Sequence, residues 1–106
     1  MELNEKLFKA LANKTRLAIL HWLKDPEKEI HVVSCQTIQY ELEHFGGICV
    51  GDIVQQSGLA QSTISSYLNM LEEVGLLISE RHGKWTYYRR NEPAFQELSS
   101  LIKEEL

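Results

Sequence analysis

Four residues between positions 31 and 49 carry donor atoms suited to metal or redox chemistry. They are two imidazoles and two thiols: His31, Cys35, His44 and Cys49. Imidazole and thiolate groups are ligands that Zn²⁺ prefers in tetrahedral sites, and two thiols can also be oxidised to a disulfide. However, their spacing along the chain matches no compact metal-binding loop. We therefore predict packing or surface roles for all four, with no bound metal and no cofactor. A zinc site and a thiol switch stay open as alternatives.

The chain contains no recognisable catalytic arrangement. There is no glycine-rich phosphate-binding loop, and the adjacent carboxylates at 72–73 and 104–105 diverge on their helices. No carboxylate pair lies near a candidate nucleophile in the sequence. We predict that the protein is not an enzyme.

Short hydrogen-bonding side chains cover one face of the segment 61–74. A rotation of about 100° per residue places Ile64, Leu68 and Leu71 on the opposite, apolar face. A neutral polar helix face can enter the major groove of DNA and reach base edges or phosphates, whereas the alternative is a solvated helix surface. We predict that the groove-reading residues are Gln61, Ser62, Thr63, Ser65, Ser66, Tyr67 and Asn69.

A basic hairpin follows this helix. The segment 81–90 contains four basic residues and no acidic residue. Its tip residues Arg81, His82 and Lys84 are predicted to lie in or beside the minor groove, and the alternative is a charged hairpin in solvent. If every basic residue of two such hairpins contacted phosphate, log affinity would fall against log salt with a slope no steeper than about −7.

Hydrophobic periodicity and turn residues predict the elements that position these side chains. We expect helices over 4–11, 13–24, 38–45, 52–57 and 61–74, strands over 76–80 and 85–89, and a last helix capped by Asn91. Asn13 and Thr37 are expected caps, and Pro26 ends the second helix. The turn at 58–60 joins two helices as in a helix-turn-helix, and 81–84 form the hairpin loop.

The fold class is therefore mainly α with a small β-hairpin (α+β), a winged helix-turn-helix. We expect residues 1–106 to form a single DNA-binding domain in which 24–46 are an insert before the helix-turn-helix. The amphipathic stripe of Ile38, Leu42 and Phe45 belongs to this insert.

The net charge of −4 among 106 residues first argues against a nucleic-acid partner. However, the insert holds two basic and five acidic residues, so acidity is concentrated away from the basic hairpin. We expect weak non-specific DNA binding. Two cysteines are too few for a disulfide framework, and no apolar run is long enough for a membrane span. These features predict a cytoplasmic protein with no membrane partner.

Two segments resemble the ArsR/SmtB family of bacterial winged-helix repressors: LFKALANKTRLAIL at 7–20 and GLAQSTISSYL at 58–68. The resemblance covers nearly the whole chain apart from 24–46. It implies a homodimer that binds an inverted repeat in double-stranded DNA and leaves it when a metal or another signal arrives. It also implies a dimer interface made by both terminal helices, for which we expect Leu3, Leu7, Phe95, Leu98, Leu101 and Ile102.

The chain departs from this family at its metal sites. Metal-sensing members resemble ELCVCDL where this chain has GICVGDI at 47–53, so Cys49 matches the first thiolate and Gly51 replaces the second. The other common family site uses the last helix, but no His or Cys follows His82. Neither metal site of the family can therefore be assigned to this chain.

We predict a homodimeric, sequence-specific transcriptional regulator, a repressor released by an unidentified signal. One alternative is a winged-helix module that associates with proteins and binds no DNA. Another is a regulator that responds to thiol oxidation or metal through Cys35 and Cys49.

Overall fold

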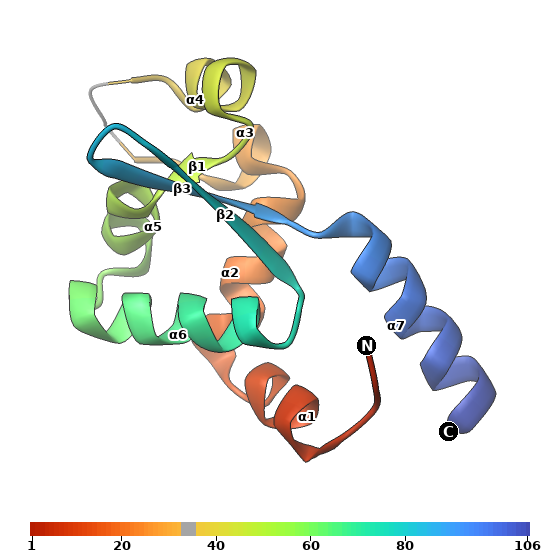
Figure 1. The fold of residues 1–106 in the computed structure, drawn as a ribbon. Helices are drawn as coiled ribbons and strands as arrows, with labels where there is room; N and C mark the ends of the chain where they lie inside the picture. Colours follow the sequence, from red (N-terminus) through yellow and green to blue (C-terminus); the bar gives the residue numbers. More distant parts are fainter. Residues whose placement is uncertain (33–35) are drawn as a thin grey trace.

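The computed structural model describes residues 1–32 and 36–106 and has the predicted winged helix-turn-helix architecture (Figure 1). Its elements are α1 (Glu5–Leu11), α2 (Lys14–Lys24), α3 (Pro26–Glu29), α4 (Ile38–Phe45), β1 (Ile48–Cys49), α5 (Val50–Ser57), α6 (Gln61–Glu73), β2 (Leu77–His82), β3 (Trp85–Arg90) and α7 (Glu92–Glu105). The α+β fold class is confirmed. In the described part of the chain, no helix is long and apolar enough to cross a membrane.

The predicted helix caps are largely confirmed. The side chain of Asn13 accepts a hydrogen bond from the amide of Arg16, and Thr37 accepts one from Tyr40. These bonds satisfy amide groups that a helix start leaves unpaired. Asn91 stands at the start of α7 but does not cap it, because its side-chain amide donates to the carbonyl of Gly75 at 2.9 Å.

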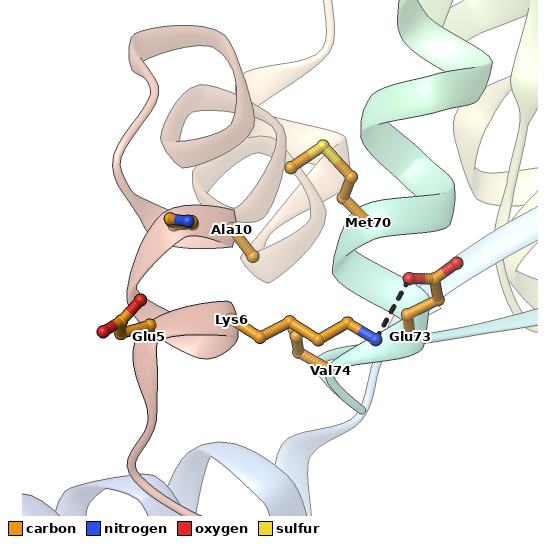
Figure 2. Close-up of a pocket in the computed structure, with 7 residues that line it drawn as sticks. Glu5, Lys6, Ala10, Met70, Glu73 and Val74 are labelled. Atoms are coloured by element: carbon orange, nitrogen blue, oxygen red, sulfur yellow. Dashed lines mark ion pairs between the residues drawn. The ribbon is translucent and has the colours of Figure 1, made fainter.

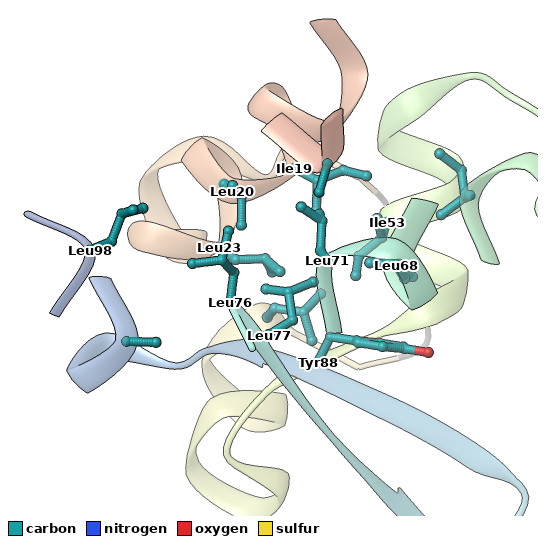
Figure 3. Close-up of a cluster of buried hydrophobic side chains, with 14 of the residues drawn as sticks. Ile19, Leu20, Leu23, Ile53, Leu68, Leu71, Leu76, Leu77, Tyr88 and Leu98 are labelled. Carbon is teal, nitrogen blue, oxygen red and sulfur yellow. The ribbon is translucent and has the colours of Figure 1, made fainter. Parts of the chain in front are cut away.

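The core lies between α1, α2, α5, α6 and the sheet (Figure 3). Its centre is formed by side chains with no exposed surface: Ile19, Ile48, Ile53, Ile64, Leu68, Leu71 and Leu76. Leu98 brings α7 to the edge of this core, while the later turns of α7 project away from the body (Figure 1).

The hairpin carries a third strand that the sequence did not indicate. β1 pairs antiparallel with β3, which places β3 between β1 and β2. Gly47 precedes β1, and a Cβ atom at this position would lie 2.7 Å from the carbonyl oxygen of Tyr88. The close approach of the two backbones therefore requires glycine at 47.

The strands of the hairpin are longer than predicted. Strand pairing continues to His82 and Trp85, so Arg81 and His82 belong to β2 and only 83–84 form the turn. Gly83 has φ = +65°, which permits a tight two-residue connection. In addition, α5 begins two residues earlier than expected, and the short helix α3 was not expected.

Candidate nucleic-acid interface

The helix-turn-helix consists of α5, the turn at 58–60 and α6. Ile64, Leu68 and Leu71 on α6 are fully buried against the core. Ser62, Ser66 and Asn69 are exposed on the same helix. Packing thus leaves a neutral polar face of α6 directed away from the core.

The predicted groove-reading residues on the flanks of α6 differ in their exposure to solvent. Gln61 is exposed, whereas Thr63, Ser65 and Tyr67 are half-buried. The ring of Tyr67 packs against the core and lies 4.9 Å below the guanidinium of Arg16. Tyr67 therefore also supports the body of the domain.

Arg16, within the segment 7–20, is a buried basic residue that joins three helices. It is 7% exposed, and its guanidinium donates to the carbonyl of Ala10 at 2.7 Å and to that of Lys9 at 2.8 Å. These carbonyls lie in the last turn of α1, where carbonyl groups lack the regular helical partner; that of Lys9 also accepts a hydrogen bond from the amide of Ala12. Arg16 thus connects α1 to α2 and, through Tyr67, to α6.

No described side chain caps the first turn of α6. Ala60 stands at its N-cap and makes no capping hydrogen bond, and the turn contains no acidic residue. The helix dipole and unpaired amides at such an end favour an anion. In Figure 1 this end of α6 and the turn of the hairpin both lie toward the left edge of the view.

The charge of the hairpin is partly neutralised. Glu80, just before the basic segment, accepts a hydrogen bond from Arg89 at 2.8 Å across the strands and lies 3.3 Å from the imidazole of His82. The hydrogen bond and charge of Arg89 lower the pKa of Glu80, with a smaller contribution from His82. One of the four basic residues of this segment is therefore paired with an acidic residue just outside it.

The guanidinium of Arg90 is also engaged, by a carboxylate and an aromatic ring. Its guanidinium pairs with Glu92 at 2.9 Å, stacks on the ring of Phe95 at 3.7 Å and is 12% exposed. Within residues 1–32 and 36–106, the hairpin cations that form no ion pair are Arg81 and Lys84. Both are exposed beside the turn.

Two buried carboxyl groups lie behind the hairpin, and the sequence reasoning missed them. Glu41 is 1% exposed and Asp52 is 6% exposed. Oε1 of Glu41 accepts a hydrogen bond from the amide of Cys49 at 2.8 Å, but Oε2 has no donor facing it in the described part of the chain. Burial, together with the neighbouring carboxyl group of Asp52, raises the pKa of Glu41 to about 8. The burial of Glu41 could have been predicted from its position on the apolar stripe of α4, three residues after Ile38.

The donor residues proposed for metal or redox chemistry are dispersed. His31 is exposed, and the ring of His44 is stacked on Tyr40 at 3.8 Å. Cys35 lies outside the described residues. In the described segments, no group of three or more His, Cys, Asp or Glu residues is placed to hold a metal ion.

The chemistry of Cys49 disfavours a thiol switch. Burial raises the pKa of its thiol, and the charges of Asp52 and Glu41 add to the shift. Oxidants and metals react with the thiolate, so a raised pKa lowers the reactivity of Cys49 at neutral pH.

The terminal helices provide the surfaces expected to form a dimer. Leu7 and Leu98 are already buried in the single chain, whereas Leu3, Phe95 and Leu101 are half-buried. Ile102 is 41% exposed on α7. Exposed apolar side chains that were not predicted occur nearby in the sequence: Met1, Phe8, Leu17 and Leu106.

A half-open groove of about 390 Å³ separates α1 from the C-terminal end of α6. Figure 2 shows the Lys6 side chain crossing it toward Glu73, which it meets at 3.4 Å. Met70 and Val74 line the side formed by α6 and its end. The groove thus lies at the end of α6 opposite Gln61.

Comparisons with known proteins agree with this architecture. Residues 40–79 match the family model described as "Bacterial regulatory protein, arsR family". The HTH-type transcriptional regulator YbzH of Bacillus subtilis is 41% identical over 101 residues, covering 95% of this chain and 96% of that protein. An arsenical resistance operon repressor from the same species is 32% identical, covering 96% and 76%.

Solved structures show the same fold. A possible transcriptional regulatory protein from Mycobacterium bovis, in a crystal structure of its fragment 1–100, is 28% identical with a TM-score of 0.63, and the match covers 92% of this chain and 84% of that one. A solution structure from the same organism, described as a homodimeric winged helix-turn-helix DNA-binding domain, gives 26% identity, a TM-score of 0.61 and coverage of 92% and 72%. Together with the fold, these similarities show that the chain belongs to the arsR family of bacterial regulatory proteins, which are DNA-binding transcriptional regulators.

Proposed function

We propose that the protein is a homodimeric repressor that binds an inverted-repeat operator until a signal releases it. The observation that carries this proposal is the exposed polar face of α6, formed by Ser62, Ser66 and Asn69, opposite a fully buried apolar face. Short hydrogen-bonding side chains on an uncharged helix face can read base edges, whereas basic side chains would attract the phosphates of any DNA sequence. The repressor role is supported by the similarity to the arsenical resistance operon repressor of Bacillus subtilis.

Recognition is proposed to begin at the amino end of α6. Gln61 lies in the first turn and Asn69 two turns later, and both amides can form two hydrogen bonds with adenine. Thr63, Ser65 and Tyr67 flank this face. The uncapped amides of the first turn would receive a phosphate, and this contact would set the depth of the helix in the groove.

The hairpin is proposed to act as a wing, with Arg81 and Lys84 as its phosphate contacts and His82 beside them. Among the described residues, the ion pairs of Arg89 and Arg90 leave these two as the wing cations without an acidic partner, and Arg81 donates only to the carbonyl of Gly83. The wing would therefore contribute affinity for any DNA sequence, whereas α6 would contribute specificity.

The dimer is proposed to form through α7 and α1. Ile102 and Leu106 leave apolar surface exposed on the projecting part of α7, and Phe8 does so on α1. The Mycobacterium bovis domain described as homodimeric supports the formation of a dimer. Two subunits would then place their α6 helices in major grooves about one helical turn apart, roughly 34–36 Å.

Selection of duplexes from a random library by the wild-type protein tests the operator proposal and supplies the probe for every binding assay. An inverted repeat is expected. Gln61→Ala and Asn69→Ala should each weaken binding by about 1–3 kcal/mol and relax the preference at one base pair. Gln39→Ala, an exposed amide on α4, is the matched control. Equal binding to all duplexes would contradict the proposal.

Sedimentation of Ile102→Glu tests the dimer separately. The wild type should sediment as a dimer and the variant as a monomer with weaker operator binding, because a buried charge without a partner opposes association. Tyr40→Glu is a matched control, since Tyr40 and Ile102 are both 41% exposed. A dimer in both variants would exclude α7 from the interface.

A further inference from the structure

Helix α4, which belongs to the insert, packs against the wing. Figure 1 shows α4 beside the turn of the β2–β3 hairpin. Its last residue, Phe45, stacks on the ring of Tyr87 with centroids 4.3 Å apart and planes inclined by 26°. The same ring lies 5.1 Å from that of His82. Phe45 thus contacts both strands of the wing at once.

These contacts reach the part of the wing that carries the free charges. His82 is the last residue of β2 and directly precedes the turn at 83–84. Arg81 precedes His82, and Lys84 is in the turn itself. Tyr87 is 3% exposed and lies 5.6 Å from His82, so the three rings form one cluster.

Helix α4 is itself fixed to the helix-turn-helix. Glu41 binds the amide of Cys49, and Cys49 pairs with Tyr87 in the sheet. Glu41 also neighbours Asp52, which lies on α5. The position of Phe45 is therefore tied to the same elements that hold α6.

A hairpin without such support is a weak scaffold. β1 pairs with β3 only at Tyr87 and Tyr88, so the end of the wing beyond them has two strands, and two strands alone are only marginally stable in water and can twist widely. A wing that has to be ordered during binding loses affinity, because the cost of fixing its side chains is subtracted from the contacts they make. A ring clamped against both strands lowers that cost before DNA arrives.

We propose that Phe45 is a positioning residue for DNA binding, which holds the wing so that Arg81 and Lys84 meet the phosphates while α6 occupies the major groove. This inference rests on the proposed contact between the wing and DNA. Phe45 itself touches no DNA. The insert would thereby take part in binding without adding a basic residue to the interface.

A double-mutant cycle tests the inference. Binding of a labelled selected duplex is measured by fluorescence anisotropy over a range of salt concentrations. The proteins are the wild type, Phe45→Ala, the pair Arg81→Ala with Lys84→Ala, and the three changes combined. Gln39→Ala is the control on the same helix, because its side chain is exposed and bonds to Glu43 rather than to the wing. Melting curves confirm that each protein is folded at the assay temperature.

Phe45→Ala is expected to weaken binding by about three- to tenfold and to reduce the salt slope toward that of the wing pair. In the wing-pair background, it should change affinity by less than twofold, because the residues it positions are already absent. Gln39→Ala should keep the wild-type affinity and slope. Phe45→Tyr, which retains the ring, should restore both.

Two results would overturn the inference in different ways. If Phe45→Ala has no effect, or has the same effect with and without Arg81 and Lys84, Phe45 does not act through the wing, although the wing can still bind DNA. If the wing pair itself leaves affinity and slope unchanged, the proposed wing contact fails as well. Should Phe45→Ala unfold, Phe45→Leu is used in the same cycle, since it keeps apolar volume under α4 but removes the stacking.

Discussion

Replacing Glu41 by Gln should stabilise the folded protein at neutral and alkaline pH. The carboxyl group of Glu41 is buried next to Asp52, and no donor among the described residues faces its Oε2. A proton on Oε2 would let it donate to Asp52, so that two carboxyl groups share one proton. A glutamine amide can make both bonds without titrating: its oxygen accepts from Cys49 and its nitrogen donates to Asp52.

The magnitude follows from the pKa of Glu41, which rises from 4.5 to about 8 on folding. Between these values the folded state keeps a proton that the unfolded state has lost. The free energy of unfolding therefore decreases as pH rises through this window, by up to about 1.4 kcal/mol per pH unit. Below this pH window Glu41 is protonated in both the folded and the unfolded state, and above it Glu41 is ionised in both. Relative to pH values below the window, the free energy of unfolding at pH 7 is lower by on the order of 3 kcal/mol.

Urea unfolding followed by circular dichroism at several pH values measures this effect, at one fixed protein concentration because dimers are stabilised by mass action. Glu41→Gln should match the wild type near pH 4.5 and exceed its stability increasingly toward pH 8. Glu43→Gln is the control, since Glu43 is an exposed carboxylate on the same helix bonded to Gln39. Parallel curves for the wild type and Glu41→Gln would refute the shared proton.

Three further predictions concern packing and charge. Gly47→Ala should destabilise the fold by about 1–3 kcal/mol in urea unfolding, because the new Cβ would lie 2.7 Å from the carbonyl oxygen of Tyr88. Arg16→Lys should cost about 1.5–3 kcal/mol by the same measurement, since an ammonium group cannot reach both carbonyls and the aromatic ring in one plane. The salt slope contributed by two wings should be about −3.6, as expected for Arg81 and Lys84 alone, and a slope near −7 would show that the ion pairs open on DNA.

The parts of the fold governed by local signals could be predicted from the sequence. Asn13 and Thr37 mark helix starts, and the buried stripe of α6 follows directly from its spacing. β1 could not be predicted, because two residues show no periodicity and the strand depends on pairing with β3.

The charges were harder to predict than the helices. The Arg89–Glu80 ion pair is diagonal across the hairpin, so it depends on a register that is known only when the turn is placed at 83–84. Glu41 was counted only as one of the acidic residues of the insert, and its place on the apolar stripe of α4, which indicates burial, was not considered. Both features depend on tertiary contacts: one pairs a charged residue with an opposite charge, and the other removes an acidic residue from solvent.

The ion pairs within the wing also bear on how fast the protein meets DNA. A paired cation and carboxylate form a dipole, whose field decays with distance more steeply than that of a free charge. With a Debye length of about 8 Å at physiological salt, little attraction remains beyond the first layers of water. Association should therefore proceed near the unsteered range of about 10⁵–10⁶ M⁻¹s⁻¹. The lifetime of the complex, rather than the speed of encounter, would then distinguish the operator from other DNA.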